Sequence, residues 1–130
     1  MDLQSISRKP AVLVLEDDML LAMDMEDHLT DLGYHVEGPF SRVDQALHAI
    51  PSLNIIGAVV DLNLNGEFSF PVIEALHSRQ IPVIVCSGYA ELPGLKARLS
   101  GIPLIAKPWN PDKLAQLVSD VFEPVRRKVG

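Results

Sequence analysis

The sequence predicts an α/β fold in which helices cover both faces of a five-stranded parallel sheet. Five short apolar runs alternate along the chain with stretches whose apolar residues recur at helical spacing. The strongest runs are almost continuously apolar, which is typical of strands buried on both faces. Because a helical stretch separates each strand from the next, right-handed crossovers and parallel pairing are favoured.

The predicted strands differ in how strongly their residues support them. In chain order they cover residues 11–15, 34–37, 55–60, 82–86 and 102–106. The first, AVLVL, is entirely apolar, and the third leads directly into Asp61. The second is short and half polar, so we expect it to lie nearer an edge of the sheet.

The helical stretches are predicted from apolar stripes and from their end signals. The stripes are Leu21, Met25, Leu29 and Leu32; Val43, Ala46, Leu47 and Ile50; Phe70, Ile73, Leu76 and His77; and Leu114, Leu117, Val118 and Val121. Gly33 suits a C-terminal cap, and Pro51 ends the second helix. Asn110 suits the cap of the last helix and Pro111 its first position, whereas Pro124 is expected to end or bend it.

Composition bounds the class of protein. A chain of 130 residues with 48% hydrophobic residues corresponds to one domain with a sizeable core. The net charge of −6 argues against a nucleic-acid surface, and the basic cluster at 126–128 suits the end of a helix dipole. The single cysteine, Cys86, excludes an intramolecular disulfide. With no signal-peptide pattern and no membrane-length apolar run, we expect a cytoplasmic protein that binds no membrane.

Polar residues follow four of the predicted strands at the edge where α/β sheets bind ligands. They are Glu16, Asp17 and Asp18 after the first strand, Asp61 after the third, Ser87 after the fourth, and Lys107 with Pro108 after the fifth. Loops are commonly polar, so any one of these residues alone would be ordinary. Their convergence on one rim indicates a site.

The residue types at this rim suit phosphoryl transfer. Neighbouring carboxylates repel one another by about 4 kcal/mol per pair at ~4 Å and an effective dielectric of ~20. A hard cation removes that repulsion, and an all-oxygen site suits Mg²⁺. Lys107 can hold a phosphate oxygen, and a carboxylate can form an acyl phosphate. Asp61, alone on the central strand, is the predicted nucleophile, whereas Asp18 better suits a helix cap than a metal ligand.

Four segments together resemble the landmarks of response-regulator receiver domains in two-component signalling. VLVLEDD, VVDLNLNG, VIVCSGY and IAKPW occur in the family's order and spacing, over about residues 10–123. The resemblance implies a flavodoxin-like fold for residues 1–130 as one receiver domain without an output domain. It also implies a phosphoacceptor of a histidine kinase or phosphotransfer protein, not a classical enzyme, that signals to a downstream protein partner.

The resemblance implies a role for each residue at the rim. Glu16 and Asp17 would position Mg²⁺, Asp61 would be phosphorylated, and the main-chain carbonyl of Asn63 would complete the protein ligands. Ser87 and Lys107 would bond phosphoryl oxygens, with a cis peptide between Lys107 and Pro108.

Two positions depart from the common receiver pattern. Ser87 stands where threonine is usual, and Leu104 stands where many receivers carry a switch tyrosine or phenylalanine. A rotating aromatic ring is therefore not the expected switch.

The segment 91–100 contains Pro93 and Gly94 and makes a poor helix. We expect phosphoryl capture by Ser87 to shift or order residues 89–99.

Other features bear on the partner. Cys86-Ser87-Gly88-Tyr89, followed by Leu92-Pro93, resembles the FATGUY branch of receivers, which is associated with HWE-type histidine kinases. Met19, Leu20 and Met23 fall outside the helix's core stripe and lie just beyond the acidic pair. They would either dock a kinase's helical bundle or be partly buried against neighbouring loops.

Three alternatives are weaker. A phospho-independent interaction module with a relic site is disfavoured because the full set of site residues is present. A phosphatase of the haloacid dehalogenase class needs a second acid two residues after the nucleophile, where this chain has Asn63. A nucleotide-binding Rossmann domain needs a glycine-rich loop after the first strand, which is missing here.

Overall fold

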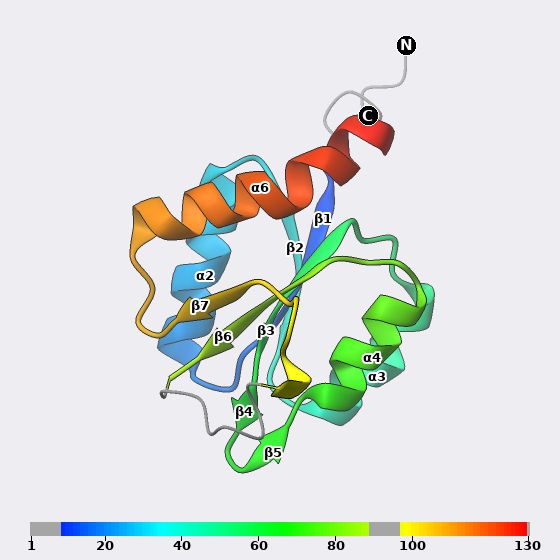
Figure 1. The fold of residues 1–130 in the computed structure, drawn as a ribbon, viewed down its shortest axis with the longest axis vertical. Helices are drawn as coiled ribbons and strands as arrows, with labels where there is room; N and C mark the ends of the chain where they lie inside the picture. The colour runs from blue at the N-terminus through cyan, green and yellow to red at the C-terminus, as the bar shows by residue number, and fades with distance from the viewer. Residues whose placement is uncertain (1–8, 89–96, 130) are drawn as a thin grey trace.

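The computed structural model describes residues 9–88 and 97–129 (Figure 1). Its elements are β1 (Ala11–Leu15), α2 (Met19–Asp31), β2 (His35–Phe40), α3 (Val43–Ala49), η1 (Ile50–Ser52), β3 (Gly57–Asp61), β4 (Asn63–Leu64), β5 (Glu67–Phe68), α4 (Phe70–Ser78), β6 (Val83–Ser87), β7 (Leu104–Ala106) and α6 (Pro111–Val129). The predicted helix over residues 91–100, and the shift expected of residues 89–99, fall mostly outside the described residues. No helix within the described ranges is long and apolar enough to cross a membrane.

The main sheet confirms the predicted fold. Five parallel strands lie in the order β2-β1-β3-β6-β7, with β2 at an edge as expected. The chain runs from β1 to β2 on one side and returns to β3 on the other. The strand order therefore reverses between β1 and β3, and α/β folds bind ligands at the carboxyl ends of such a strand pair.

Two apolar cores lie on opposite faces of this sheet. Within β1, Leu13 and Leu15 pack on the face covered by α3 and α4. Val12 and Val14 pack on the opposite face, against α2 and α6. Figure 1 shows these two helix layers on either side of the central strands. Since alternate residues of one strand point to opposite faces, the unbroken AVLVL run supplies both cores.

Gly57 explains how closely α6 approaches the sheet. A Cβ atom on Gly57 would lie 2.4 Å from the ring of Phe122, a fully buried residue of α6. The glycine in β3 therefore makes room for an aromatic ring on the neighbouring helix. Close backbone approach is a recognised reason for glycine inside a strand.

The helix ends agree with most of the end signals. Asn110 caps α6 through its Oδ1, which accepts from the backbone N–H of Lys113. Gly33 follows α2 with a φ of +96°, a conformation that glycine adopts without strain. Pro124 was expected to end or bend the last helix. It does not end the helix, since α6 runs through Pro124 to Val129.

Two residues of the predicted stripes do not belong to the core. Leu32 is 37% exposed because α2 ends at Asp31 and the chain turns there into β2. His77 is exposed because the buried face of α4 is formed by Phe70, Val72, Ile73 and Leu76, which leaves the helix end toward solvent. Position in a short helix, and not spacing alone, decides burial here.

Candidate functional site

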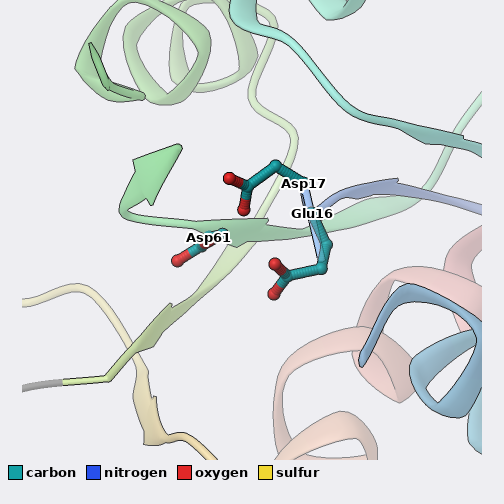
Figure 2. Close-up of side chains that lie close together, drawn as sticks. All are labelled: Glu16, Asp17 and Asp61. Atoms are coloured by element: carbon teal, nitrogen blue, oxygen red, sulfur yellow. The ribbon is translucent and has the colours of Figure 1, made fainter. Parts of the chain in front are cut away.

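Three carboxylates converge at the carboxyl ends of β1 and β3. Glu16 and Asp17 directly follow β1, and Asp61 is the last residue of β3. Carboxylate oxygens of the three residues all lie within 4.8 Å of one another. Figure 2 shows the three side chains gathered at the ends of the strands. Glu16 is 5% exposed and Asp61 is 3% exposed, whereas Asp17 is half-buried. The sequence prediction that these acids share one rim is confirmed.

Lys107 brings a positive charge to the same carboxylates from the loop after β7. Its Nζ lies 2.9 Å from Oε1 of Glu16 and donates a hydrogen bond to Oδ2 of Asp61 at 3.0 Å. The backbone N–H of Lys107 donates to the carbonyl of Ser87 at 2.9 Å, which joins this loop to the end of β6. The Lys107–Pro108 peptide is cis, as expected.

Burial changes the pKa values of the charged groups. Burial raises the pKa of Glu16 to about 7, against the lowering effect of the Asp18 amide and of Lys107. Burial also raises the pKa of Asp61, again opposed by Lys107. For Lys107, burial lowers the pKa, but the bonds to Glu16 and Asp61 outweigh it and raise the value above the ordinary one. Burial therefore disfavours the charged forms of Glu16 and Asp61, and the bonds to Lys107 offset only part of that cost.

The donor set fits a divalent cation. Three carboxylates face one ammonium group, so ionised acids leave an excess of negative charge in a partly buried place. Closely spaced carboxylate oxygens are the ligands preferred by hard cations such as Mg²⁺. Glu16 and Asp61 each bond Lys107 through one oxygen, and Asp17 contributes a third carboxylate at the half-exposed side.

Asn63 and Asp18 lie at the margins of this group. Asn63 is exposed in β4, and its backbone N–H donates to Oδ1 of Asp61 at 3.4 Å. Asp18 caps α2, as predicted, through an Oδ1 that accepts from the amides of Leu20 and Leu21. The amide of Asp18 in turn donates to Oε2 of Glu16 at 3.0 Å. The cap thus fixes the start of α2 beside the carboxylates.

Ser87 ends β6 at the same rim and is partly buried. Its carbonyl accepts the Lys107 amide, so the predicted hydroxyl and lysine come from adjacent strand ends. Cys86, next to it, is buried in the apolar core as expected, and burial raises the pKa of its thiol.

Two polar contacts near the site were not predicted from the sequence. The hydroxyl of Ser69, which is fully buried, donates to the carbonyl of Asp61 at 2.6 Å. The indole N–H of Trp109 donates to Oδ2 of Asp24 at 2.7 Å and so links the Lys107 loop to α2. Trp109 belongs to the IAKPW segment, but the spacing of that segment does not indicate a partner 85 residues away, and Ser69 lies outside all four segments.

The β4–β5 hairpin was not predicted from the sequence. Asn65 and Gly66, with φ values of 54° and 94°, form the turn between these two short strands. An Asn-Gly pair is a strong hairpin signal and was the available clue. The hairpin places Asn63 immediately beside Asp61.

The apolar residues beyond the acidic pair are exposed. Met19 is 75% exposed, Leu20 79% and Met23 55%, all on the first two turns of α2. We call these three residues the α2 patch. Within residues 9–88 and 97–129, these side chains are not buried against neighbouring loops, which was one of the two interpretations left open by the sequence.

The chain is similar in sequence and structure to proteins that are described as regulators. No family model matches the chain. The chain is 28% identical over 114 residues to the phyllosphere-induced regulator PhyR of Methylorubrum extorquens, covering 85% of this chain and 43% of PhyR. This chain thus spans less than half the length of that relative. The crystal structure of the response regulator PhyR from Brucella abortus shares 28% identity and a TM-score of 0.75, over 95% of this chain and 52% of that one.

A second similarity extends over most of both chains. The solution structure of SdrG from Sphingomonas melonis Fr1 shares 32% identity and a TM-score of 0.75, covering 85% of this chain and 94% of SdrG. The BeF3-activated conformation of SdrG from Pseudomonas melonis Fr1 shares 32% identity and a TM-score of 0.72. The sheet and the helices on both its faces are thus similar to those of SdrG in either form.

Proposed function

The chain belongs to the response-regulator receiver family, and on that premise we propose that Asp61 accepts a phosphoryl group from a phosphohistidine of a partner histidine kinase. The observation that carries the proposal is the meeting of Glu16, Asp17 and Asp61 with Lys107 at one strand-end rim. The BeF3-activated form of the similar protein SdrG supports it further.

In the proposed reaction a carboxylate oxygen of Asp61 forms a bond to phosphorus as the bond from phosphorus to the histidine nitrogen breaks. Glu16, Asp17 and Asp61, with the main-chain carbonyl of Asn63, would hold Mg²⁺. When bound, Mg²⁺ supplies charge neutralisation for the carboxylates and the transferred group. Later attack by water would release inorganic phosphate and restore the carboxylate.

Lys107 and Ser87 would stabilise the phosphoryl group. Because Nζ of Lys107 already lies 3.0 Å from Oδ2 of Asp61, a group added to Asp61 forms beside an ammonium charge. Fixed charges and donors around a transferring phosphoryl group are the main catalytic contribution a protein makes to such a step. The Ser87 hydroxyl, at the end of the adjacent strand, is the proposed second contact.

Replacing the acceptor tests this proposal. We expect Asp61→Asn to abolish labelling by acetyl phosphate in the presence of Mg²⁺ while the circular dichroism spectrum stays unchanged. Asp27→Asn, at an exposed position of α2, is the matched control and should be labelled like the wild type. Equal labelling of Asp61→Asn and the wild type would overturn the assignment, and a wild type that takes no label would favour a phospho-independent interaction module.

The α2 patch is the proposed docking surface for the kinase. It lies on the first turns of the helix that follows Glu16 and Asp17, so a helical bundle seated there would bring its phosphohistidine close to Asp61. Apolar anchors on a helix face are a common mode of helix recognition. An HWE-type kinase, as in the FATGUY branch, is our proposal for the partner. Tyr89, Leu92 and Pro93 of that motif lie outside the described residues.

Comparing two phosphoryl donors, a histidine kinase and the small molecule acetyl phosphate, tests the docking proposal. In Leu20→Ala/Met23→Ala, phosphotransfer from a panel of HWE-type kinases should slow by roughly tenfold or more, since buried apolar anchors dominate interface energy. Labelling by acetyl phosphate should be unchanged, and Leu32→Ala at the far end of α2 is the control. A loss with both donors would place the defect in the site and not in docking.

A further inference from the structure

We infer that Ser69 is a positioning residue for the phosphoacceptor, holding the peptide between Asp61 and Leu62 in a fixed orientation. The inference rests on the proposed function of Asp61. Ser69 lies immediately before α4, is fully buried, and is eight residues after Asp61. Its hydroxyl donates to the Asp61 carbonyl at 2.6 Å and lies 3.3 Å from the Leu62 carbonyl.

The ordinary role of a serine at this position is to cap the helix that follows, and the contacts exclude it. Ser69 occupies the N-cap position of α4, yet its side chain makes no hydrogen bond to the helix. The amides of Val72 and Ile73 bond the backbone carbonyl of Ser69, at 3.0 and 3.1 Å. Pro71 has no N–H to cap. The hydroxyl is instead directed at the phosphoacceptor strand.

The peptide that joins Asp61 to Leu62 is held from both sides. Its N–H, on Leu62, donates to the carbonyl of Cys86 in β6 at 2.9 Å, and its C=O, on Asp61, accepts from Ser69. Because a peptide unit is planar, two bonds at opposite edges fix the orientation of the whole plane. That orientation sets where the Asp61 side chain starts and where the chain proceeds toward Asn63.

Ser69 also closes the loop that carries Asn63. The backbone N–H of Ser69 donates to the carbonyl of Leu62 at 2.9 Å, and within the loop the amide of Gly66 donates to Oδ1 of Asn63 at 2.7 Å. Asn63 is exposed, so packing of its side chain does not hold the loop. Leu64 packs in the core and β4 pairs with β5, and the hydrogen bonds from the buried serine join the end of this segment to Asp61 and Leu62. The main-chain carbonyl of Asn63 in this segment is the proposed metal ligand.

The variant Ser69→Ala removes the hydroxyl and leaves the Asp61 carbonyl buried without that donor. We expect the Leu62 amide of the metal-free protein to exchange faster with solvent deuterium. We also expect Mg²⁺ to bind about fivefold more weakly or worse, the size of effect that a lost buried hydrogen bond produces. Mg²⁺ binding is followed by the fluorescence of Trp109, the chain's single tryptophan, at a temperature where both proteins are folded.

Ser78→Ala is the matched control, because the Ser78 hydroxyl also donates to a backbone carbonyl, that of Ala75 at 2.8 Å, but at an exposed helix end. It should leave the exchange of Leu62 and the Mg²⁺ affinity unchanged. Ser69→Cys, which keeps a weak donor of similar size, should show an intermediate loss and replaces the alanine variant if that one does not fold.

The outcomes separate this inference from the proposed function. A merely structural Ser69 would lower the melting temperature of Ser69→Ala but leave Mg²⁺ affinity and Leu62 exchange at the wild-type values, which would overturn the inference. The inference is equally overturned if Ser69→Cys, used alone, binds Mg²⁺ like the wild type. A wild-type protein that binds no Mg²⁺ and takes no phosphoryl group would instead overturn the proposed function.

Discussion

The two ends of the sheet differ in the balance of charge among the side chains that lie there. At the carboxyl ends of the strands, the site cluster of Glu16, Asp17, Asp61 and Lys107 sets three carboxylates against one ammonium group. At the opposite end, a far-end cluster joins Tyr34 with α6. There Glu123 accepts from the Tyr34 hydroxyl and pairs with Arg126 at 3.5 Å.

The charges of the far-end cluster balance one another, whereas those of the site cluster do not. One carboxylate faces one guanidinium and a neutral phenol, and Arg126 also lies 5.3 Å over the Tyr34 ring. Such a group needs nothing further and fastens α6 to the start of β2. The site cluster has surplus negative charge in a partly buried place, which is unfavourable until a cation arrives. This difference in charge supports the proposal that the site cluster binds a cation, whereas the far-end cluster joins α6 to the start of β2.

The largest expected difference between the clusters is in their pH dependence. Burial raises the pKa of Glu16 from 4.5 to about 7, so the folded state binds this proton more tightly than the unfolded state. The resulting stability is fully present below pH 4.5 and is lost as the pH rises through about 7. We expect the metal-free protein to lose on the order of 1–3 kcal/mol of unfolding free energy over that window.

Mg²⁺ should reverse this trend, because the ion binds the ionised carboxylates of the folded state. Urea unfolding at several pH values, with EDTA or with millimolar Mg²⁺, measures both effects. The Tyr34 hydroxyl should affect stability only at alkaline pH, since burial and Glu123 raise its pKa to about 12. A metal-free stability that rises between pH 5 and pH 7 would contradict the account.

Removing the far-end carboxylate should destabilise the protein. Glu123→Gln weakens the bond from Tyr34 and removes the pair with Arg126, so we expect a loss of about 1–2 kcal/mol. Mg²⁺ affinity should not change. The exposed residue Glu74 of α4 provides the control, as Glu74→Gln should be within about 0.5 kcal/mol of the wild type.

Removing a carboxylate of the site cluster should stabilise the metal-free protein, which is the opposite of the effect at the far-end cluster. In the metal-free protein, Asp17→Asn relieves repulsion with Glu16 and Asp61, and we expect a gain of about 1 kcal/mol. The same variant should gain less from Mg²⁺ than the wild type does. Thermal unfolding with and without Mg²⁺ measures both quantities, and a destabilised metal-free Asp17→Asn would show that the surplus charge is not unfavourable.

The fold, and the position of the site residues at one rim of the sheet, could be predicted from the sequence because both depend on local patterns. Apolar runs and helical spacing predict the strands, and the polar residues that end parallel strands must meet at one edge. The cap by Asp18 and the start of α6 at Pro111 follow equally local rules.

The features that could not be predicted depend on contacts between distant residues. Ser69 has the sequence signature of a helix cap, and only the structure shows its hydroxyl on the Asp61 carbonyl. The exposure of His77 depends on where α4 ends, and the spacing of apolar residues does not show that α6 continues through Pro124 to Val129. Periodicity and propensity do not contain this information.

The residue that carries the phosphoryl group can be located directly on the wild-type chain. The protein is incubated with acetyl phosphate and Mg²⁺, digested under conditions that preserve acyl phosphates, and mapped by mass spectrometry. We expect a single modified residue, Asp61, with no labelling when EDTA replaces Mg²⁺. A phosphoryl group on Asp17 or on a histidine, or equal labelling of Asp61 with EDTA, would contradict this expectation.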